Sequence, residues 1–350
     1  MEKVTKLGNS KVGFGQPCFI ICEGGVTNYG QIDLAKKQAE AAYLAGADIV
    51  KFQLTKTEKL VSKKVSKRLE KELGYNWFDR MKYKEFSPRQ IKEIFDYSKK
   101  LGIDVFATAH DDESLEYLDK SLKQKFFKVG SGEAHNYEFI KNIAKRHKPV
   151  IISFGIQTDL EVIKAISTLK NNGVKDIIVL HCVSMYPTPY TDANLMRMEH
   201  LRRILKLPVG ISDHSVGWHI PLAAVAMGAC VVEKHITFDK KDPRSLDNPG
   251  ALLPEEFKIM VSQIRDIEMA KRIIPEKERI LRLKKGRDWA GQSMVANRDI
   301  PAGTILRKEM IDFKRPGRGG LPSAFIDEVT GKRVIKNIEE DEQILMKDLE

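Results

Sequence analysis

Polar side chains stand near the ends of eight apolar, strand-like runs in this 350-residue sequence. The runs begin at Cys18, Asp48, Asp104, Phe126, Pro149, Ile177, Pro208 and Val231. The polar residues near their ends are Glu23, Lys51, Gln53, Thr108, Lys128, Ser131, Ser153, His181, Ser184, Asp213, His214, Glu233, Lys234 and His235. One or two such groups are ordinary in a core, but each buried polar group costs roughly 1–3 kcal/mol if it is left unpaired. A whole ring of polar strand ends therefore predicts one shared, charged site.

Two histidines in this ring have the placement expected of metal ligands. His214 and His235 close the seventh and eighth runs, which are neighbours if the strands follow one another in a closed sheet. Imidazole nitrogens bind divalent transition metals, and water and substrate oxygens can complete the coordination shell. The pattern predicts a two-histidine metal site; a purely structural role for each ring is the alternative.

Two lysines indicate an anionic substrate. Lys51 and Lys128 each lie between two large apolar residues, so their ammonium groups are expected to point into the mouth of the fold rather than into solvent. An anion there would gain charge-assisted hydrogen bonds. Hydroxyl groups suited to phosphate and carboxylate oxygens are those of Thr108, Ser131, Ser153 and Ser212.

The elements that must position these groups alternate regularly along the chain. Helical periodicity separates the apolar runs, for example over residues 34–45, 91–101, 160–169 and 259–270. Eight strand–helix units predict a (β/α)8 TIM barrel over residues 1–273, with its working residues at the carboxyl ends of the strands. One connection is long: residues 54–86 hold Tyr75, Trp77, Phe78 and Tyr83 and are expected to form either an active-site lid or a packed surface excursion.

The pattern changes after the barrel. Residues 274–288 are strongly charged and are predicted to be a linker, and residues 289–350 show short alternating runs and turns typical of a small β-rich domain. A domain of this size needs support from the barrel or from a partner.

Charge and cysteine content exclude several classes of protein. The net charge is +11, and residues 271–287 hold 8 basic and 2 acidic residues without interleaved aromatics, so we expect a solvated face and no nucleic-acid partner. No apolar run reaches membrane-spanning length, so no membrane partner is expected. The four scattered cysteines predict reduced thiols and a cytoplasmic protein.

At five motifs the sequence resembles the sialic acid synthase (N-acetylneuraminate synthase) family. They are VKFQ (50–53), FFKVGSGEAHNYEFIK (126–141), LHCVSMYPTPY (180–190), LPVGISDHSVG (207–217) and EKHITFD (233–239). The stretch 293–332, with RDIPAGTIL and KRPGRG, is similar to the family's C-terminal antifreeze-protein-like (SAF, β-clip) domain. The resemblance implies an α/β barrel followed by this small domain, and a transferase that makes nonulosonic acids.

The resemblance also implies a role for each matching residue. His214 and His235 would bind a divalent metal, commonly Mn²⁺, with Mg²⁺ or Co²⁺ also possible, and would be catalytic together with Glu23 and Asp247. Phosphoenolpyruvate would be held by Lys51, Thr108, Lys128, Ser131, Ser153 and Ser212. Gln53, Ser184 and Tyr186 would lie near the sugar, and Arg315 would reach it from the partner subunit of a domain-swapped homodimer.

The sequence departs from the family's usual pattern on the sugar side. The first strand is followed by EGGVTNYG (23–30) instead of E-I-G-x-N-H-N-G, and the third ends in TAHD (108–111) instead of T-P-F-D. SLDNPGAL (245–252) replaces G-P-D-H-x-A-S, and Ser184 stands where asparagine is frequent. We therefore expect an acceptor other than plain N-acetylmannosamine, with a diacetamido 6-deoxyhexose and a phosphorylated sugar both open.

The expected reaction is condensation of phosphoenolpyruvate with an N-acylated hexosamine-type aldehyde, giving a nonulosonic acid and phosphate. The metal would polarise the aldehyde, and water held by the metal or by Glu23 would add as the carbon–oxygen bond to phosphate breaks. The alternatives are a synthase for a phosphorylated or non-amino sugar, and a Schiff-base aldolase using Lys51 or Lys128. A protein that binds ice or carbohydrate surfaces is disfavoured, because residues 289–350 contain only Thr304 and Thr330 as threonines.

Overall fold

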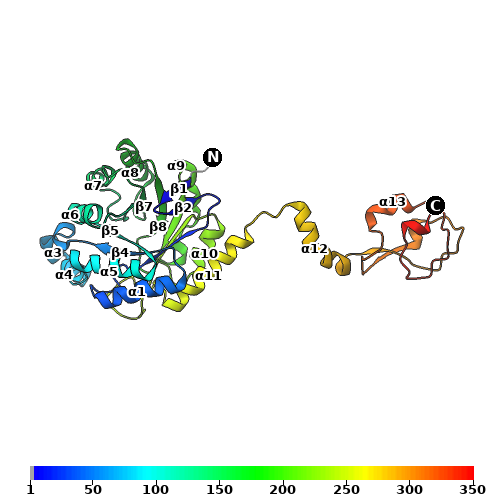
Figure 1. Cartoon of the computed structure of the whole chain (residues 1–350), viewed down its shortest axis with the longest axis horizontal. Coiled ribbons are helices and arrows are strands. Elements are labelled where there is room, and N and C mark those ends of the chain that lie inside the picture. The colour runs from blue at the N-terminus through cyan, green and yellow to red at the C-terminus, as the bar shows by residue number, and fades with distance from the viewer. Residues whose placement is uncertain (1–3) are drawn as a thin grey trace. The chain divides into compact units, whose positions relative to one another are not determined.

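The computed structural model describes residues 4–350, which form two compact units, one up to Lys271 and the other Arg272–Glu350 (Figure 1). The first unit is a parallel barrel. Its strands are β3 (Phe19–Glu23), β4 (Ile49–Leu54), β5 (Asp104–Ala109), β6 (Phe127–Val129), β7 (Val150–Phe154), β8 (Ile177–Cys182), β9 (Val209–Asp213) and β10 (Val231–His235). They run in the order β5-β4-β3-β10-β9-β8-β7-β6, so the predicted (β/α)8 fold is confirmed.

Helices cover the outside of the barrel. They are α1 (Ile32–Ala45), α5 (Pro88–Leu101), α6 (Asp112–Glu116, continued by a π-helical turn), α7 (Tyr137–Ala144), α8 (Asp159–Asn171), α9 (Met196–Leu205), α10 (His219–Ala226) and α11 (Pro254–Ala270). Local sequence signals set several of their ends. Ser87 and Gln90 form a capping box at the start of α5, and Gly46, at a φ of 78°, ends α1 in the left-handed conformation.

The barrel closes through a side chain. Strands β5 and β6 are the two ends of the hydrogen-bonded order, and the Gln124 amide bridges the gap between them. Ala107 N donates to Gln124 Oε1 at 2.9 Å, and Gln124 Nε2 donates to the carbonyls of Ala107 and Phe126 at 3.0 and 2.9 Å. The buried Gln124 amide thus satisfies backbone groups of Ala107 and Phe126 that would otherwise need hydrogen bonds between β5 and the short strand β6.

Alternation along each strand divides the barrel interior into an apolar base and a polar top. Inward-facing positions near the strand starts are apolar, and they form one cluster with the hairpin of β1 (Val4–Leu7) and β2 (Ser10–Gly13). The next inward position is polar on most strands, as at Glu23, Lys51, Lys128 and Glu233. The polar ring thus lies at the carboxyl end, above a packed apolar floor.

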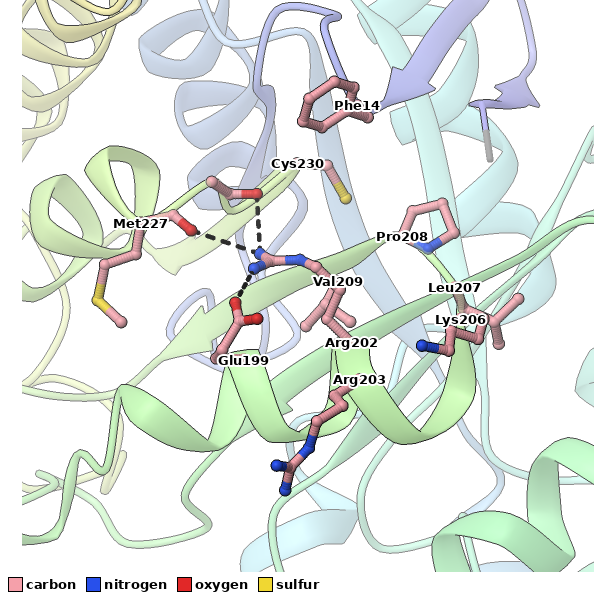
Figure 2. A pocket seen from close by; sticks show the side chains of 11 residues that line it. Phe14, Glu199, Arg202, Arg203, Lys206, Leu207, Pro208, Val209, Met227 and Cys230 are labelled. Atoms are coloured by element: carbon pink, nitrogen blue, oxygen red, sulfur yellow. Dashed lines mark hydrogen bonds and ion pairs between the residues drawn. The ribbon is translucent and has the colours of Figure 1, made fainter. Parts of the chain in front are cut away.

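The amino-terminal side of the barrel holds a separate cavity of about 490 Å³ beneath α9 (Figure 2). Arg202 pairs there with Glu199 and donates to the carbonyls of Met227 and Gly228, the latter at 3.1 Å. Because these carbonyls follow the last turn of α10, the guanidinium compensates the negative end of that helix.

The connection over residues 54–86 is helical rather than a loop. It contains α2 (Thr57–Leu60), α3 (Lys63–Leu73) and α4 (Trp77–Lys82), with Ser62 and Asn76 as side-chain caps of the last two.

No helix among the described residues is long and apolar enough to cross a membrane.

The second unit begins with α12 (Glu276–Ala290), so most of the predicted linker is a helix, and none of its side chains is buried. The small domain that follows pairs β11 (Ser293–Ala296) with β12 (Ile311–Lys314) and includes the short helix α13 (Ile326–Val329). Its own core comprises Met294, Ala296, Ile300, Leu306, Ile311, Val329, Val334, Ile338, Ile344 and Leu349.

Candidate active site

A cavity of about 360 Å³ opens at the carboxyl ends of the barrel strands. It is lined by twelve of the residues predicted from the sequence: Lys51, Gln53, Thr108, Lys128, Ser131, Ser153, Ser184, Tyr186, Ser212, His214, His235 and Asp247. Glu23 lies fully buried in contact with Lys51 and Gln53. Arg315 is exposed in the second unit, directly after β12.

Three polar strand-end residues do not belong to this site. His181, Asp213 and Lys234 lie one position out of phase with the inward-facing residues, so the expectation of a single shared site is wrong for them. Lys234 Nζ pairs with Asp213 Oδ2 at 2.5 Å, and His181 Nε2 bonds to the carbonyl of Ala193 at 2.9 Å. These contacts stabilise the barrel wall.

Two lysines and two glutamates form a buried cluster at the base of the cavity. Lys51 Nζ lies 2.6 Å from Glu23 Oε2 and 3.4 Å from Glu233 Oε2. Lys128 Nζ lies 3.0 and 3.1 Å from the two oxygens of Glu233, and Ser212 Oγ donates to Glu233 Oε1 at 2.8 Å. Glu233 thus joins both lysines, which places their ammonium groups side by side at the cavity floor.

Burial and pairing oppose each other in this cluster. Burial would lower the pKa of Lys51, but the carboxylates of Glu23 and Glu233 outweigh it and raise that pKa. Burial would likewise raise the pKa of Glu233, but Lys128 and Lys51 keep it below its usual value. Burial prevails at Glu23, where it raises the pKa against the effect of Lys51, and at Lys128, where it lowers the pKa against the effect of Glu233.

The two predicted metal ligands face each other across the same cavity. The ring centroids of His214 and His235 are 5.3 Å apart, and the ring of Tyr186 lies 4.3 Å from that of His214. His214 Nδ1 bonds to the carbonyl of Val183 at 3.0 Å, and His235 Nδ1 lies 3.3 Å from Asp247 Oδ2. Such contacts to one ring nitrogen are typical of metal-binding histidines, because they fix the ring and leave Nε2 free.

The protonation of these rings also suits a metal. Burial lowers the pKa of His214 to about 4 and lowers the pKa of His235 well below its usual value, so both imidazoles are neutral at neutral pH. Residues 4–350 contain no group of three or more His, Cys, Asp or Glu side chains positioned for a metal ion. A metal held by His214 and His235 would therefore take its remaining ligands from water and substrate.

Three further cavity residues were not assigned from the sequence. His110 Nδ1 lies 3.0 Å from Glu133 Oε1; burial would lower the pKa of His110, but the Glu133 carboxylate raises it. Lys84 also lines the cavity, and burial lowers its pKa to about 8 against the nearby carboxylate of Asp247. A sequence signal for His110 was its place in TAHD, the departure from the family's usual pattern, and Glu133 stands in the matching motif directly after Gly132, whereas nothing local marks Lys84.

Comparisons with known proteins agree with this fold. The profile of the NeuB family matches residues 39–273, and that of the SAF domain matches residues 291–350. The chain is 37% identical to an N,N'-diacetyllegionaminic acid synthase of Campylobacter jejuni (93% of this chain, 98% of the relative). It is 34% identical to an N-acetylneuraminate-9-phosphate synthase of Mus musculus (97% and 94%). The crystal structure of an N-acetylneuraminic acid synthetase from Leptospira borgpetersenii in complex with citrate superimposes with a TM-score of 0.70 at 31% identity, covering 82% of this chain and 98% of that one.

Proposed function

Because this chain belongs to the NeuB family and ends in a SAF domain, we propose that it condenses phosphoenolpyruvate with an N-acylated hexosamine-type sugar aldehyde. The products are a nonulosonic acid and phosphate. Relatives that cover nearly the whole chain are named as synthases of N,N'-diacetyllegionaminic acid and of N-acetylneuraminate 9-phosphate, which supports the reaction class and leaves the acceptor to be determined.

The observation that carries the proposal is the pair of lysines on the cavity floor. Lys51 and Lys128 lie within 3.4 Å of Glu233, and the hydroxyl of Ser153 is buried with no hydrogen-bond partner among the described residues. A substrate that carries both a carboxylate and a phosphate would pair with the two ammonium groups and satisfy such hydroxyls. Phosphoenolpyruvate has this combination of groups.

The residues of the chain can position each bond change. The methylene carbon of phosphoenolpyruvate bonds to the aldehyde carbon, whose oxygen gains a proton. A water oxygen adds to the second carbon of phosphoenolpyruvate, the bond from that carbon to the phosphate oxygen breaks, and that carbon becomes the ketone of the product. Of the two protons that the water loses, one balances the proton gained by the aldehyde oxygen and the other leaves with phosphate. In the proposed reaction Glu23, whose pKa burial raises, would accept the first proton that the water loses. A divalent metal at His214 and His235, proposed as Mn²⁺ with Mg²⁺ or Co²⁺ as alternatives, would supply Lewis acidity toward the aldehyde oxygen.

The main mechanistic rival, a Schiff-base aldolase, needs a neutral amine. Ion pairs raise the pKa of Lys51, which disfavours it as that nucleophile, whereas the lowered pKa of Lys128 leaves this residue as the one to test. Borohydride in the presence of pyruvate, whose ketone such an aldolase would bind covalently, would trap an adduct on Lys128 if the rival were correct, and the proposal predicts no adduct.

We further propose a cytoplasmic homodimer in which Arg315 of each chain reaches the partner's cavity. The motivation is the resemblance of the segment KRPGRGG to the family's C-terminal domain and the exposure of Arg315 within its own unit.

A panel of acceptor sugars tests the proposed reaction. Purified protein with added Mn²⁺ should release phosphate from phosphoenolpyruvate only when an N-acylated hexosamine is present, and chelator should stop the release. Phosphate release without any acceptor, or with non-amino sugars alone, would overturn the proposal.

A further inference from the structure

The segment that carries Ser131 follows the shortest strand of the barrel. Strand β6 has only three residues, Phe127–Val129, and Ser131 comes two positions after its end. Ser131 lines the cavity, and its hydroxyl is one of those expected to hold the phosphoenolpyruvate anion. A hydroxyl group contributes fully to binding only if its neighbours hold it in the right place, so the contacts that hold Ser131 matter for the site.

The side chain of Gln157 makes most of these contacts. Gln157 lies after β7 and directly before Thr158, the N-cap residue of α8. Its Nε2 donates to the carbonyl of Ser131 at 2.7 Å, and its Oε1 accepts from Ser131 Oγ at 3.2 Å. The same Oε1 accepts from the backbone N–H groups of Gly155 and Ile156, both at 3.2 Å. One amide thus joins the segment after β6 to the segment after β7.

The partners of Gln157 determine which way its amide points. The carbonyl of Ser131 can only accept a hydrogen bond, and the N–H groups of Gly155 and Ile156 can only donate one, so a flipped amide would lose all three bonds. The side chain is buried, and its further contact, from Nε2 to His135 Nδ1 at 3.5 Å, is too long to contribute much. Gln157 does not itself line the cavity, so it can influence a substrate only through its neighbours.

The hydrogen bonds of Ser131 keep its oxygen in place and leave its proton available. Ser131 Oγ accepts from Gly155 N at 2.9 Å, and its hydrogen points to Gln157 Oε1 over the longer distance of 3.2 Å. Because a hydroxyl group rotates, this hydrogen can turn from Gln157 to an anion in the cavity. Gln157 Oε1 then keeps its two bonds from the backbone, so no buried acceptor is left unpaired.

We propose that Gln157 is a positioning residue for phosphoenolpyruvate, which holds Ser131 so that its hydroxyl group can donate to the anion. This inference rests on the proposed synthase activity and adds a residue to it. Gln157 lies outside the five motifs that the sequence shares with the family, so the resemblance assigns it no role.

A double-mutant cycle tests whether Gln157 acts through Ser131. Calorimetric titration with phosphoenolpyruvate and Mn²⁺, without a sugar, gives the affinity independently of turnover. Gln157→Met, which has a similar size but cannot make these bonds, should weaken binding roughly 5- to 30-fold, as expected for one or two neutral hydrogen bonds. The KM for the sugar should stay nearly unchanged. Gln157→Met combined with Ser131→Ala should bind no more weakly than Ser131→Ala alone, because both changes remove the same contact.

A second variant and a control complete the experiment. Gln157→Glu keeps an acceptor for the two backbone N–H groups but replaces the donor to the Ser131 carbonyl, so it should weaken binding at least as much as Gln157→Met. Gln263→Met is the control, because Gln263 on α11 accepts from Trp218 Nε1 at 2.7 Å and does not line the cavity. Its affinity for phosphoenolpyruvate should equal that of the wild type, and thermal unfolding of every variant detects a general loss of folding.

Three results would refute the role of Gln157 while the wild-type protein still binds phosphoenolpyruvate. They are an unchanged affinity in both Gln157 variants, losses that multiply when Gln157→Met and Ser131→Ala are combined, and an equal loss of affinity for the sugar. If the wild-type protein neither binds phosphoenolpyruvate nor releases phosphate with any hexosamine, the proposed function itself is wrong, and the inference fails with it.

Discussion

The two floor lysines are held by carboxylates that an incoming anion must share. Glu233 contacts both Lys51 and Lys128, so the ammonium groups stay in position before any substrate arrives. An ammonium group fixed in this way needs little rearrangement when the substrate binds. We therefore expect much of the rate enhancement to come from positioning the substrate.

We predict that Lys51→Gln and Lys128→Gln each weaken the binding of phosphoenolpyruvate more than that of the sugar. Loss of one charge-assisted hydrogen bond should cost roughly 1.5–3 kcal/mol, or about 10- to 150-fold in affinity. The KM values for both substrates measure the difference, with Lys56→Gln as a control on an exposed lysine that pairs with Glu113. Unchanged KM for phosphoenolpyruvate in both variants would contradict the assignment.

His214 and His235 should be needed for metal binding. We predict that His214→Ala and His235→Ala each remove most of the bound Mn²⁺, because two protein ligands leave no substitute for the one that is lost. Elemental analysis after dialysis gives the metal content, and turnover should fall with it. His219→Ala, at an exposed position on α10, is the control. Full metal content in both cavity variants would exclude the two-histidine site.

The buried amine of Lys84 should lower the free energy of unfolding at neutral pH. Burial lowers its folded-state pKa to about 8, below the value near 10.5 in the unfolded chain. Between these two pH values Lys84 is protonated in the unfolded chain but largely neutral in the folded protein. The loss of stability from burying the charged amine is therefore complete below about pH 8 and disappears as the pH rises through about 10.5. Lys84→Met should therefore raise the free energy of unfolding at pH 7 by about 1–3 kcal/mol, and by much less near pH 10. Urea unfolding at both pH values checks this; a larger gain at pH 10 than at pH 7 would show that the sign is wrong.

At the scale of elements, the order of strands and the inward positions follow from local patterns. The apolar runs and their period of two place Lys51, Gln53 and Thr108 at the carboxyl end, and these could be predicted from the sequence. The same period also distinguishes Glu233, which faces in, from Lys234, which faces out, although both were grouped as polar strand ends.

Other features depend on contacts between distant segments. The barrel gap is closed by Gln124, whose local sequence does not reveal that role. The helical structure of residues 57–82 is stabilised by the bond from Tyr83 to Arg244, 161 positions further along the chain. The β1–β2 hairpin was not predicted, because its short strands gain stability only by packing on the barrel floor.

The contact between Tyr83 and Arg244 should hold the helices of residues 57–82 against the connection after β10. We predict that Tyr83→Phe increases hydrogen–deuterium exchange over residues 57–84 and 239–248, with a small loss of stability because the hydroxyl is partly exposed. Tyr43→Phe is the matched control, since the Tyr43 hydroxyl is exposed on α1 and makes no hydrogen bond among the described residues. Exchange that rises equally in both variants, or in neither, would show that this bond does not fix the segment.

At the scale of the whole molecule, the two units must cooperate if Arg315 takes part in the reaction. The small domain has its own core, and α12 separates it from the barrel in the chain. Function in trans is the arrangement that the family resemblance implies.

Mixing two inactive variants tests this arrangement. Lys51→Ala and Arg315→Ala should each lose activity alone, because one damages the floor of the cavity and the other removes the partner's guanidinium. If sites are shared between subunits, each heterodimer contains one intact site, so mixed samples should recover activity toward a quarter of the wild-type level by random pairing. Absence of recovery after verified subunit exchange would place Arg315 in cis or outside the reaction.

In the proposed reaction one carbon–carbon bond forms, and phosphoenolpyruvate loses phosphate by cleavage of its carbon–oxygen bond. Phosphoenolpyruvate labelled with heavy oxygen at the bridge between carbon and phosphorus tests both parts in one reaction with an N-acylated hexosamine that supports phosphate release. Mass spectrometry of the products should find the label in the released phosphate and an organic acid heavier than the sugar by one pyruvic acid. Label retained in the organic product, or phosphate released without such an acid, would contradict the account.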